Sequence, residues 1–407
     1  MQRSCLAFLA CSLMLSLVKR KGGWLSINLL RRNKNFPMNS IYFIPASQIE
    51  NTGDLLINKV AVQAIQKYGE LIIVDNQTDR WFIDEVKLTN DRQLSEVNQM
   101  SLNRHILGRL IKSLFRKDRI YVVFPPGHTA RQGKDMAKIV IQRNKRLTLF
   151  KTFGVRIVRL GFSIGPFDQA NLDAEAARSR LCYFYGLRDK GSLDTAIRGK
   201  FKNPQLFPDL AWNYEPSIAI PPIQDDSYIV LSFRSNVYGK EYDEAYFKPY
   251  VDRLKMILTA LVFRKFRIVI SYQVKYDREA SFILKRALEN DFEVQLIDKK
   301  LLLDEAAQIY SKAKFVISNR LHVLLFALQC HTASFPLIDP IGNKKIYHIW
   351  EDNKMSDAIL DINATPEENT AIIQKGVDDE NSILKPFIRA CKENRKITEE
   401  LLERVFR

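Results

Sequence analysis

Short apolar runs alternate with helical stretches along most of this chain, and this alternation constrains its fold more than any other feature. In the first half, apolar runs that suit buried strands occupy residues 41–45, 71–74, 120–124, 155–158 and 183–189. In the second half they occupy residues 228–234, 266–271, 293–297 and 313–318. Strands separated by helices at this spacing predict mostly parallel sheets of the α/β class.

The predicted helices and a proline-rich segment divide the chain into four parts. Helices are predicted up to about Tyr68 and at residues 92–115, 133–152, 242–262, 277–289 and 303–312. A glycine-punctuated loop is predicted at 161–166, and Pro216, Pro221 and Pro222 indicate a linker. A chain of 407 residues is too long for one ordinary core. We therefore expect an extension at 1–40, α/β domains at 41–215 and 223–379 with a ligand cleft between them, and a C-terminal helix at 380–407.

Positive charge is concentrated in two segments of a chain whose net charge is +16. Residues 1–40 contain seven Lys and Arg and no acid, and residues 104–159 contain fifteen against Asp118 and Asp135. A localised basic surface indicates an anionic partner such as lipid head groups, a phosphorylated substrate or nucleic acid, although solvated helix faces give the same pattern. The second segment has no aromatic stacking pattern, so no nucleic-acid partner is expected.

The five cysteines and the N-terminal segment bear on the compartment. The cysteines are scattered without a CxxC pair, which argues against a disulfide framework or a zinc site and favours a reducing compartment. The apolar run at 5–18 is shorter than the ~20 residues of a spanning helix, and Lys19-Arg20-Lys21 follows it instead of a cleavage site. Three interpretations remain open: an interfacial helix on anionic lipid, a helix packed on the first domain, or an extension upstream of a start at Met38.

The strongest candidate site is the stretch 313–328, where a buried strand ends at Ser318-Asn319 and turns directly into a helix. The N-terminus of a helix offers unpaired N–H groups and partial positive charge to an anion. Arg320 adds a forked cation suited to a phosphate or carboxylate. Beside a bound anion, His322 would favour its imidazolium form and become a possible general acid. The alternative is a structural histidine, with Arg320 in a surface ion pair.

Other strand ends offer similar chemistry. Arg234 ends the first strand of the second half, and Arg188 ends a strand of the first half, where Asp189 could hold it structurally. Asp54 precedes a helix and could be only an N-cap, with Gly53 easing a tight turn. His128 follows two prolines as an isolated candidate loop ligand. No GxGxxG and no GxxxxGK[ST] is present, so the sequence lacks nucleotide-phosphate motifs.

Taken in order, these strand ends form a set that resembles a known family. The set is Asn51-x-Gly53-Asp54, Ile164-Gly165-Pro166, Gly186-Leu187-Arg188-Asp189-Lys190-x-Ser192, Asp209-Leu210-Ala211, Ser232-Phe233-Arg234 and Ser318-Asn319-Arg320-Leu321-His322. Over about residues 41–346 it resembles the polysaccharide pyruvyl transferase family. Phe162-Ser163 stand where relatives often have a further glycine or glutamine, so contacts in that loop do not carry over.

The resemblance implies two Rossmann-like domains similar to the GT-B glycosyltransferase fold. It also implies transfer of the enolpyruvyl group of phosphoenolpyruvate (PEP) to two hydroxyls of a sugar, which gives a cyclic ketal and phosphate. His322 would protonate the methylene carbon, and the substrate-binding residues would be Arg320, Arg234, Arg188, Asn51, Gly53 and Asp54. The C-terminal domain would bind PEP and the N-terminal domain the acceptor.

The resemblance further implies that PEP is the co-substrate, with no cofactor and no metal site expected. The partner is a glycan acceptor of cell-surface polysaccharide assembly, and a lipid-linked acceptor would suit the basic segments. A cytoplasmic enzyme is expected, with residues 1–40 as a candidate for peripheral contact with the inner face of the membrane. A GT-B glycosyltransferase that uses a nucleotide sugar is the alternative. The sequence does not name the acceptor sugar.

Overall fold

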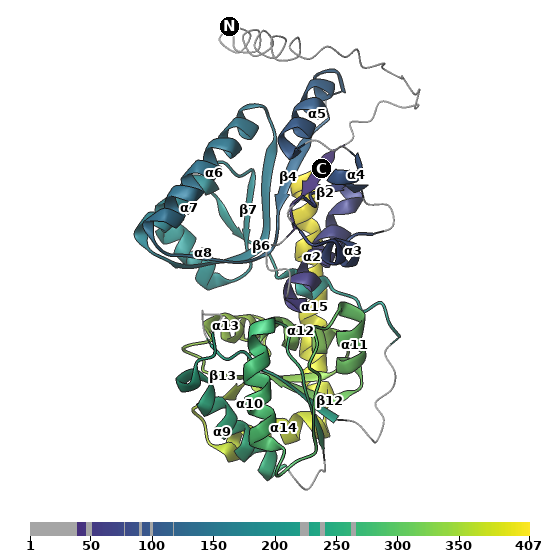
Figure 1. Ribbon diagram of the computed structural model, residues 1–407, viewed down its shortest axis with the longest axis vertical. Helices are drawn as coiled ribbons and strands as arrows, with labels where there is room; N and C mark the ends of the chain where they lie inside the picture. Colours follow the sequence, from purple (N-terminus) through teal and green to yellow (C-terminus); the bar gives the residue numbers. More distant parts are fainter. Residues whose placement is uncertain are drawn as a thin grey trace. The chain divides into compact units, whose positions relative to one another are not determined.

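The computed structural model contains two mostly parallel α/β sheets, which Figure 1 shows in ribbon form. It describes residues 39–45, 51–76, 78–88, 92–97, 101–116, 118–219, 228–236, 241–261 and 266–407. Three sequence predictions lie wholly or largely outside these residues: the extension at 1–40, of which residues 1–38 are not described, the alternative start at Met38, and the linker prolines Pro221 and Pro222. None of the helices in the described part of the chain is both long and apolar enough to cross a membrane.

The first sheet has the strand order β3-β2-β1-β4-β6-β7-β8, with β5 paired to β6, and its pairs are parallel. Its strands are β1 (Ser40–Phe43), β2 (Glu70–Ile73), β3 (Arg92–Gln93), β4 (Ile120–Phe124), β5 (Gly127–Arg131), β6 (Arg156–Phe167), β7 (Phe184–Leu187) and β8 (Pro204–Leu206). The helices of this half are α2 (Thr52–Ile65), α3 (Arg80–Val86), α4 (Leu94–Val97), α5 (Leu102–Arg116), α6 (Lys134–Thr152), α7 (Gln169–Ser179) and α8 (Lys190–Arg198).

The second sheet has the order β11-β10-β9-β12-β13-β14 and is also parallel. Its strands are β9 (Tyr228–Ser232), β10 (Arg267–Ile270), β11 (Val294–Leu296), β12 (Ala313–Ser318), β13 (Ala333–Ile338) and β14 (Leu360–Asp361). Its helices are α9 (Glu244–Ala260), α10 (Arg278–Leu288), α11 (Leu303–Ser311), α12 (Leu321–Gln329), α13 (Lys344–Asp352), α14 (Pro366–Asp378) and α15 (Asn381–Phe406). Most apolar residues of these runs are buried in the strands, as both faces of a parallel sheet require, except in the edge strand β11, whose Val294 and Leu296 are only partly buried.

The predicted glycine-punctuated loop at 161–166 is wrong, because β6 continues through it to Phe167. Phe162 and Ile164 are buried and extend the apolar pattern of the strand. Gly161 has φ +55, and the pairing of β6 with β7 shifts register between Arg159 and Phe162. The glycine therefore marks a bulge in a long strand rather than the end of a short one.

The helix α7 was not predicted because its inward face is polar. The carboxylate of Glu175 is fully buried there and forms ion pairs with Arg131, Arg159 and Arg178. Such a face gives no apolar periodicity for a sequence pattern to detect. The segment predicted as one helix at 92–115 is instead β3, α4 and α5, and the short elements α3 and β5 were also missed.

The long C-terminal helix α15 contacts parts of both halves. Its Phe406 stacks on Tyr68 at 5.4 Å between ring centroids and packs against Tyr121 at 4.9 Å. The guanidinium of Arg395 donates to the backbone carbonyl of Trp212 at 3.0 Å. Elements α2 and β13 also pack on this helix. The last helix therefore contacts elements of both sheets and helps to hold them together.

Candidate active site

The candidate site residues follow the carboxyl ends of strands in both sheets. In the first sheet, Arg188 follows β7 and Asp209 follows β8. In the second, Arg234 follows β9, and Arg320 follows β12 as the N-cap of α12. The carboxyl ends of parallel strands are where α/β proteins bind ligands.

The start of α2, in the first half of the chain, contacts residues of the second half. Asn51 is the N-cap of α2, and its side-chain oxygen accepts a hydrogen bond from the backbone N–H of Gly53 at 2.9 Å. Asn51 also forms an antiparallel bridge with Val274, and the backbone N–H of Thr52 donates to the carbonyl of Gln273 at 3.1 Å. Asn51 therefore has a structural role that fixes where α2 begins.

Arg188, Asp209 and His322 form one buried cluster. Nη1 of Arg188 donates to Oδ2 of Asp209 at 2.7 Å, and Nε2 of His322 lies 3.3 Å from that oxygen and 3.3 Å from Nη1 of Arg188. Their side chains are 2%, 1% and 11% exposed, respectively. Nε of Arg188 also donates to the hydroxyl of Ser163 at 2.8 Å. The cluster is thus preorganised by contacts between the two halves.

The partner of Arg188 is Asp209, and not Asp189 as its neighbour in sequence suggested. Asp189 instead caps α8, where its carboxylate accepts from the backbone N–H of Ser192 at 2.7 Å and from the hydroxyl of Ser163. Hydrogen bonds from Ser163 and charge from Lys345 lower the pKa of Asp189 although burial opposes them. Asp189 is therefore a structural residue that supports the strand end carrying Arg188.

The protonation of the cluster follows from its burial and charges. Burial favours neutral Asp209, but Arg188 and His322 hold the pKa of this carboxyl well below its usual range. Burial lowers the pKa of His322, and the cations Arg188 and Lys345 lower it further against the pull of Asp209. His322 is therefore a weaker base in this environment than a free histidine. A bound anion would reverse part of this shift.

Gly53 lies against the ring of His322. A Cβ at position 53 would lie 2.6 Å from Nδ1 and 2.8 Å from Cβ of His322. The Cβ of His322 joins the side chain to the backbone, so rotation of the ring alone would not relieve the clash at this second atom. The absence of a side chain at Gly53 is what lets His322 approach the first turn of α2.

Gly53→Ala should therefore displace His322 and lower kcat/KM by about tenfold to a hundredfold, because small misplacements of catalytic groups are costly. Gly108→Ala is a matched control, since a Cβ there meets no atom within 4 Å. The two variants would be compared by their kcat/KM in steady-state kinetics and by their thermal unfolding. Full activity in Gly53→Ala would show that the close contact does not fix the position of His322.

Arg320 and Arg234 lie on the second sheet's side of the site. Arg320 forms an ion pair with the buried carboxylate of Asp277, yet its Nε is buried without a hydrogen-bond partner among the described residues. The ends of β9 and β12 are tied by Asn319, which accepts from the backbone N–H of Arg234 at 2.7 Å and donates to its carbonyl at 3.1 Å. Arg320 is thus a partly neutralised cation with one buried donor that lacks a hydrogen-bond partner among the described residues.

Lys345, in the first turn of α13, was not identified from the sequence. It interacts electrostatically with Arg188, Asp209, Asp189 and Arg234. Burial and the charge of Arg188 lower the pKa of Lys345 to about 7. A half-buried lysine among arginines is a group whose charge an anion would stabilise.

Asp54 lies in the first turn of α2, next to Gly53, and interacts electrostatically with Arg188 and Asp209 of the buried cluster. Burial raises the pKa of its carboxyl to about 6, although Arg188, Lys345 and Arg320 lower it. The N-cap of α2 is Asn51, so the interpretation of Asp54 as an N-cap is wrong. A carboxylate with a pKa near neutrality is suited to accept a proton.

His128 lies near this cluster as well. Its Nε2 contacts the backbone carbonyl of Gly165, and burial together with the charge of Lys345 lowers its pKa to about 4. A neutral ring that contacts a backbone carbonyl has a structural explanation. Among the described residues, no group of three or more His, Cys, Asp or Glu side chains is arranged to hold a metal ion.

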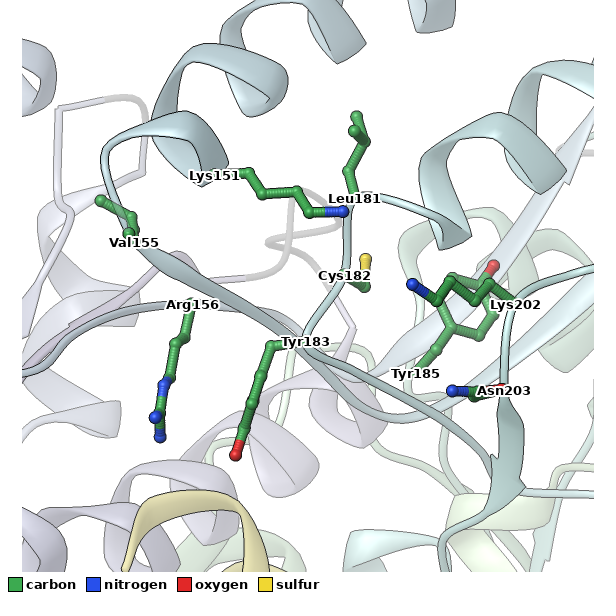
Figure 2. Close-up of a pocket in the computed structure, with 10 residues that line it drawn as sticks. Lys151, Val155, Arg156, Leu181, Cys182, Tyr183, Tyr185, Lys202 and Asn203 are labelled. Atoms are coloured by element: carbon green, nitrogen blue, oxygen red, sulfur yellow. The ribbon is translucent and has the colours of Figure 1, made fainter. Parts of the chain in front are cut away.

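A separate pocket of about 340 Å³ lies away from these residues (Figure 2). It is lined by Lys151, Gly154, Val155, Arg156, Leu181, Cys182, Tyr183, Tyr185, Lys202 and Asn203. Arg156 is the first residue of β6, and Tyr183 and Asn203 immediately precede β7 and β8. The pocket therefore lies at the amino ends of these strands, opposite the edge that carries Arg188 and Asp209.

The overall fold is similar to solved structures of the GT-B type. The Anabaena protein HepE, in complex with UDP and glucose, superposes with a TM-score of 0.54 at 11% identity over 90% of this chain and 99% of that one. UDP-GlcNAc 2-epimerase from Methanocaldococcus jannaschii gives 0.52 at 15% identity over 89% and 98%. The Neisseria meningitidis enzyme gives 0.51 at 12% over 89% and 100%. The two-domain Rossmann-like architecture expected from the sequence is confirmed.

The comparison of sequences identifies the family. No curated protein sequence matches this chain. The family model for polysaccharide pyruvyl transferase matches residues 51–338, a span that begins at Asn51 and includes Arg188, Asp209 and His322. The match covers more than half of the chain and confirms the resemblance found in its motifs. The chain belongs to the polysaccharide pyruvyl transferase family.

Proposed function

We propose that this protein transfers the enolpyruvyl group of PEP to two hydroxyls of a sugar in a cell-surface polysaccharide precursor, forming a pyruvate ketal and releasing phosphate. The observation that carries the proposal is the set of cations around His322. Arg188 contacts the ring of His322, and Lys345 interacts electrostatically with it. Arg320 and Arg234 follow the ends of the neighbouring strands β12 and β9.

PEP fits this charge distribution because it carries a phosphate and a carboxylate on one small unsaturated skeleton. Two anionic groups need several cations, and forked guanidinium groups match both. The Nε of Arg320 has no hydrogen-bond partner among the described residues, which supports a site for an anion beside this guanidinium. Lys345 adds a charge that is only partly stabilised before the anion arrives, since its pKa is about 7.

In the proposed reaction, His322 in its imidazolium form donates a proton to C3 of PEP. The C2=C3 double bond supplies the electrons, and positive charge develops at C2. The oxygen of a sugar hydroxyl attacks C2 and loses its proton. A second hydroxyl then bonds to C2 as the bond from C2 to the phosphate oxygen breaks, and the proton lost by the first hydroxyl leaves on the phosphate. The second hydroxyl proton returns to His322, which restores the acid for the next turnover.

Asp54 is the candidate base for the first hydroxyl. It interacts electrostatically with Arg188, Lys345 and Arg320 and has a pKa of about 6, so it is mostly ionised at neutral pH. A base works best when its pKa is close to the operating pH. It is three residues after Asn51, whose contacts hold the first turn of α2 in place.

The direct test is incubation of the protein with PEP and candidate glycan acceptors, including lipid-linked ones. Phosphate release should depend on the acceptor, and the mass of the sugar should increase by that of a pyruvate ketal. A thermal-shift experiment with PEP and with UDP-sugars distinguishes this proposal from the alternative, a glycosyltransferase that uses a nucleotide sugar. Stabilisation by a nucleotide sugar but not by PEP, together with transfer of its sugar, would replace this proposal with a glycosyltransferase activity.

The affinity for PEP should depend on pH through Lys345. The lysine binds anions in its charged form, and its pKa of about 7 rises when PEP binds, so binding takes up a proton above pH 7. KM for PEP should therefore increase about tenfold per pH unit above that point. Lys345→Met should raise KM by about tenfold to a hundredfold at pH 7 and flatten this dependence.

Lys344→Met is the control, because Lys344 is the adjacent lysine and is exposed to solvent. It should leave KM and its pH dependence unchanged. Isothermal titration in two buffers of different ionisation enthalpy measures the proton uptake directly. An unchanged pH dependence in Lys345→Met would exclude Lys345 as the group that titrates.

A further inference from the structure

The outer face of α6 is an apolar and basic surface without a partner in the described part of the chain. The inner face of this helix, formed by Ala137, Val140, Asn144, Leu147 and Phe150, is buried. It packs on α7 and β6 (Figure 1). This packing does not account for the exposed apolar and basic side chains on the outer side of the helix.

One side of this outer face carries large apolar side chains at helical spacing. Positions 139, 142, 146, 149 and 153 are separated by three or four residues and so lie along one line of the helix and its C-cap. Ile139, Leu149 and Phe153 occupy three of them and are 40%, 54% and 36% exposed. Met136 and Ile141 add two further exposed apolar side chains on the same helix.

The same face is strongly basic. The exposed charged residues of the helix are Lys134, Asp135, Lys138, Arg143, Lys145, Arg146 and Lys151. Of these, Lys138, Lys145 and Arg146 lie three or four residues from Gln142 or Leu149 on the outer side. Lys138 pairs with Asp135, the one acid of the helix. Within the described residues, Arg143, Lys145 and Arg146 form no ion pair, so their charge is directed to solvent or to a partner. Apolar and cationic side chains interleaved on one helix face are typical of helices that lie in a membrane interface.

The basic surface continues beyond the C-terminal end of α6 into the pocket of Figure 2. Lys151, Arg156 and Lys202 line this pocket together with Tyr183, and no carboxylate is among its lining residues. The guanidinium of Arg156 lies 4.4 Å from the ring centroid of Tyr183, which is 50% exposed. An amphipathic aromatic beside cations suits the level of lipid head groups.

We propose that the outer face of α6, from Met136 to Phe153, binds the surface of an anionic lipid bilayer. Cations alone would equally suit nucleic acid, but the exposed Ile139, Leu149 and Phe153 would gain nothing from a phosphate backbone. Burying these three side chains at the boundary of the acyl chains adds an apolar contribution to the electrostatic one. This proposal concerns a surface outside the candidate active site and does not depend on the reaction catalysed.

The test is co-sedimentation of the full-length protein with vesicles of phosphatidylcholine alone and of phosphatidylcholine mixed with phosphatidylglycerol. Binding should require the anionic lipid and decrease with added salt. Lys145→Glu combined with Arg146→Glu should weaken the partition by about thirtyfold or more, because each basic residue at an anionic surface contributes a factor of about five. Leu149→Ser combined with Phe153→Ser should also weaken it.

Lys312→Glu combined with Lys375→Glu makes the same change in net charge at two exposed positions, the C-cap of α11 and a residue of α14, and should bind like the wild type. Equal binding of the α6 variants and the wild type would assign any membrane affinity to another segment and overturn the proposal. Absence of vesicle binding, with self-association that the Leu149→Ser and Phe153→Ser changes abolish, would assign the face to a second copy of the chain. Salt-sensitive binding of RNA without vesicle binding would also overturn it.

Discussion

Replacing His322 with glutamine should lower the rate of pyruvyl transfer by about 10²- to 10⁴-fold, the range that a positioned general acid contributes. Glutamine keeps a polar side chain in the contact with Asp209 but has no acidic proton to give to C3 of PEP. The loss should appear in kcat, while the affinity for PEP changes much less, because the cations that bind the anion remain in place.

A hydrogen-isotope experiment tests whether C3 of PEP takes up a proton that exchanges with solvent, and the thermal stability of His322→Gln tests for a structural role of His322. In D₂O, the methyl group of the ketal formed by the wild type should carry a deuterium derived from solvent. His322→Gln should show slow turnover, with thermal stability close to that of the wild type. His348→Gln, at a partly exposed histidine on α13, is the matched control and should keep full activity. Wild-type kcat in His322→Gln would exclude this residue as the acid.

The positions of most candidate site residues could be predicted because each one follows the end of a strand. Arg188, Arg234, Arg320 and His322 stand at such ends in the sequence, and the parallel sheets place them at corresponding edges. Lys345 could not be found in the same way. The strand that precedes it, β13, contains Pro336 and was not predicted, because proline usually excludes a central strand. Without that strand, nothing marked the start of α13 as part of the site.

The carboxylate that pairs with Arg188 also could not be predicted from the sequence. Asp189 adjoins Arg188 in the chain, whereas Asp209 is the residue that binds it in the structure. The choice between the two carboxylates depends on the neighbouring strands β7 and β8, whose register places the residues after Leu187 and Leu206 side by side. The sequence pattern predicts strands, and the register that decides such a pairing arises from the packing of the whole sheet.

Arg188→Met should destabilise the protein by about 3–5 kcal/mol, because it leaves the carboxylate of Asp209 buried without its main partner. The ion pair has side chains 2% and 1% exposed, so water cannot replace the lost interaction. The low pKa of Asp209 means that the pair contributes its full stability above the ordinary carboxyl pKa of about 4 and loses it as the pH falls further. Lys67→Met, which breaks the exposed pair with Glu399, should change stability by less than about 1 kcal/mol.

The double variant Arg188→Met with Asp209→Leu distinguishes stability from function. Removing both charges leaves no unpaired ion, so unfolding in urea should show a large part of the lost stability restored. Activity should remain absent, because the double variant still lacks the cation that contacts His322 and the carboxylate that holds it. Recovery of activity together with stability would mean that the pair acts only as a structural link between the two halves. Continued loss of activity in a stable protein would show that the pair serves the site as well as the stability of the fold.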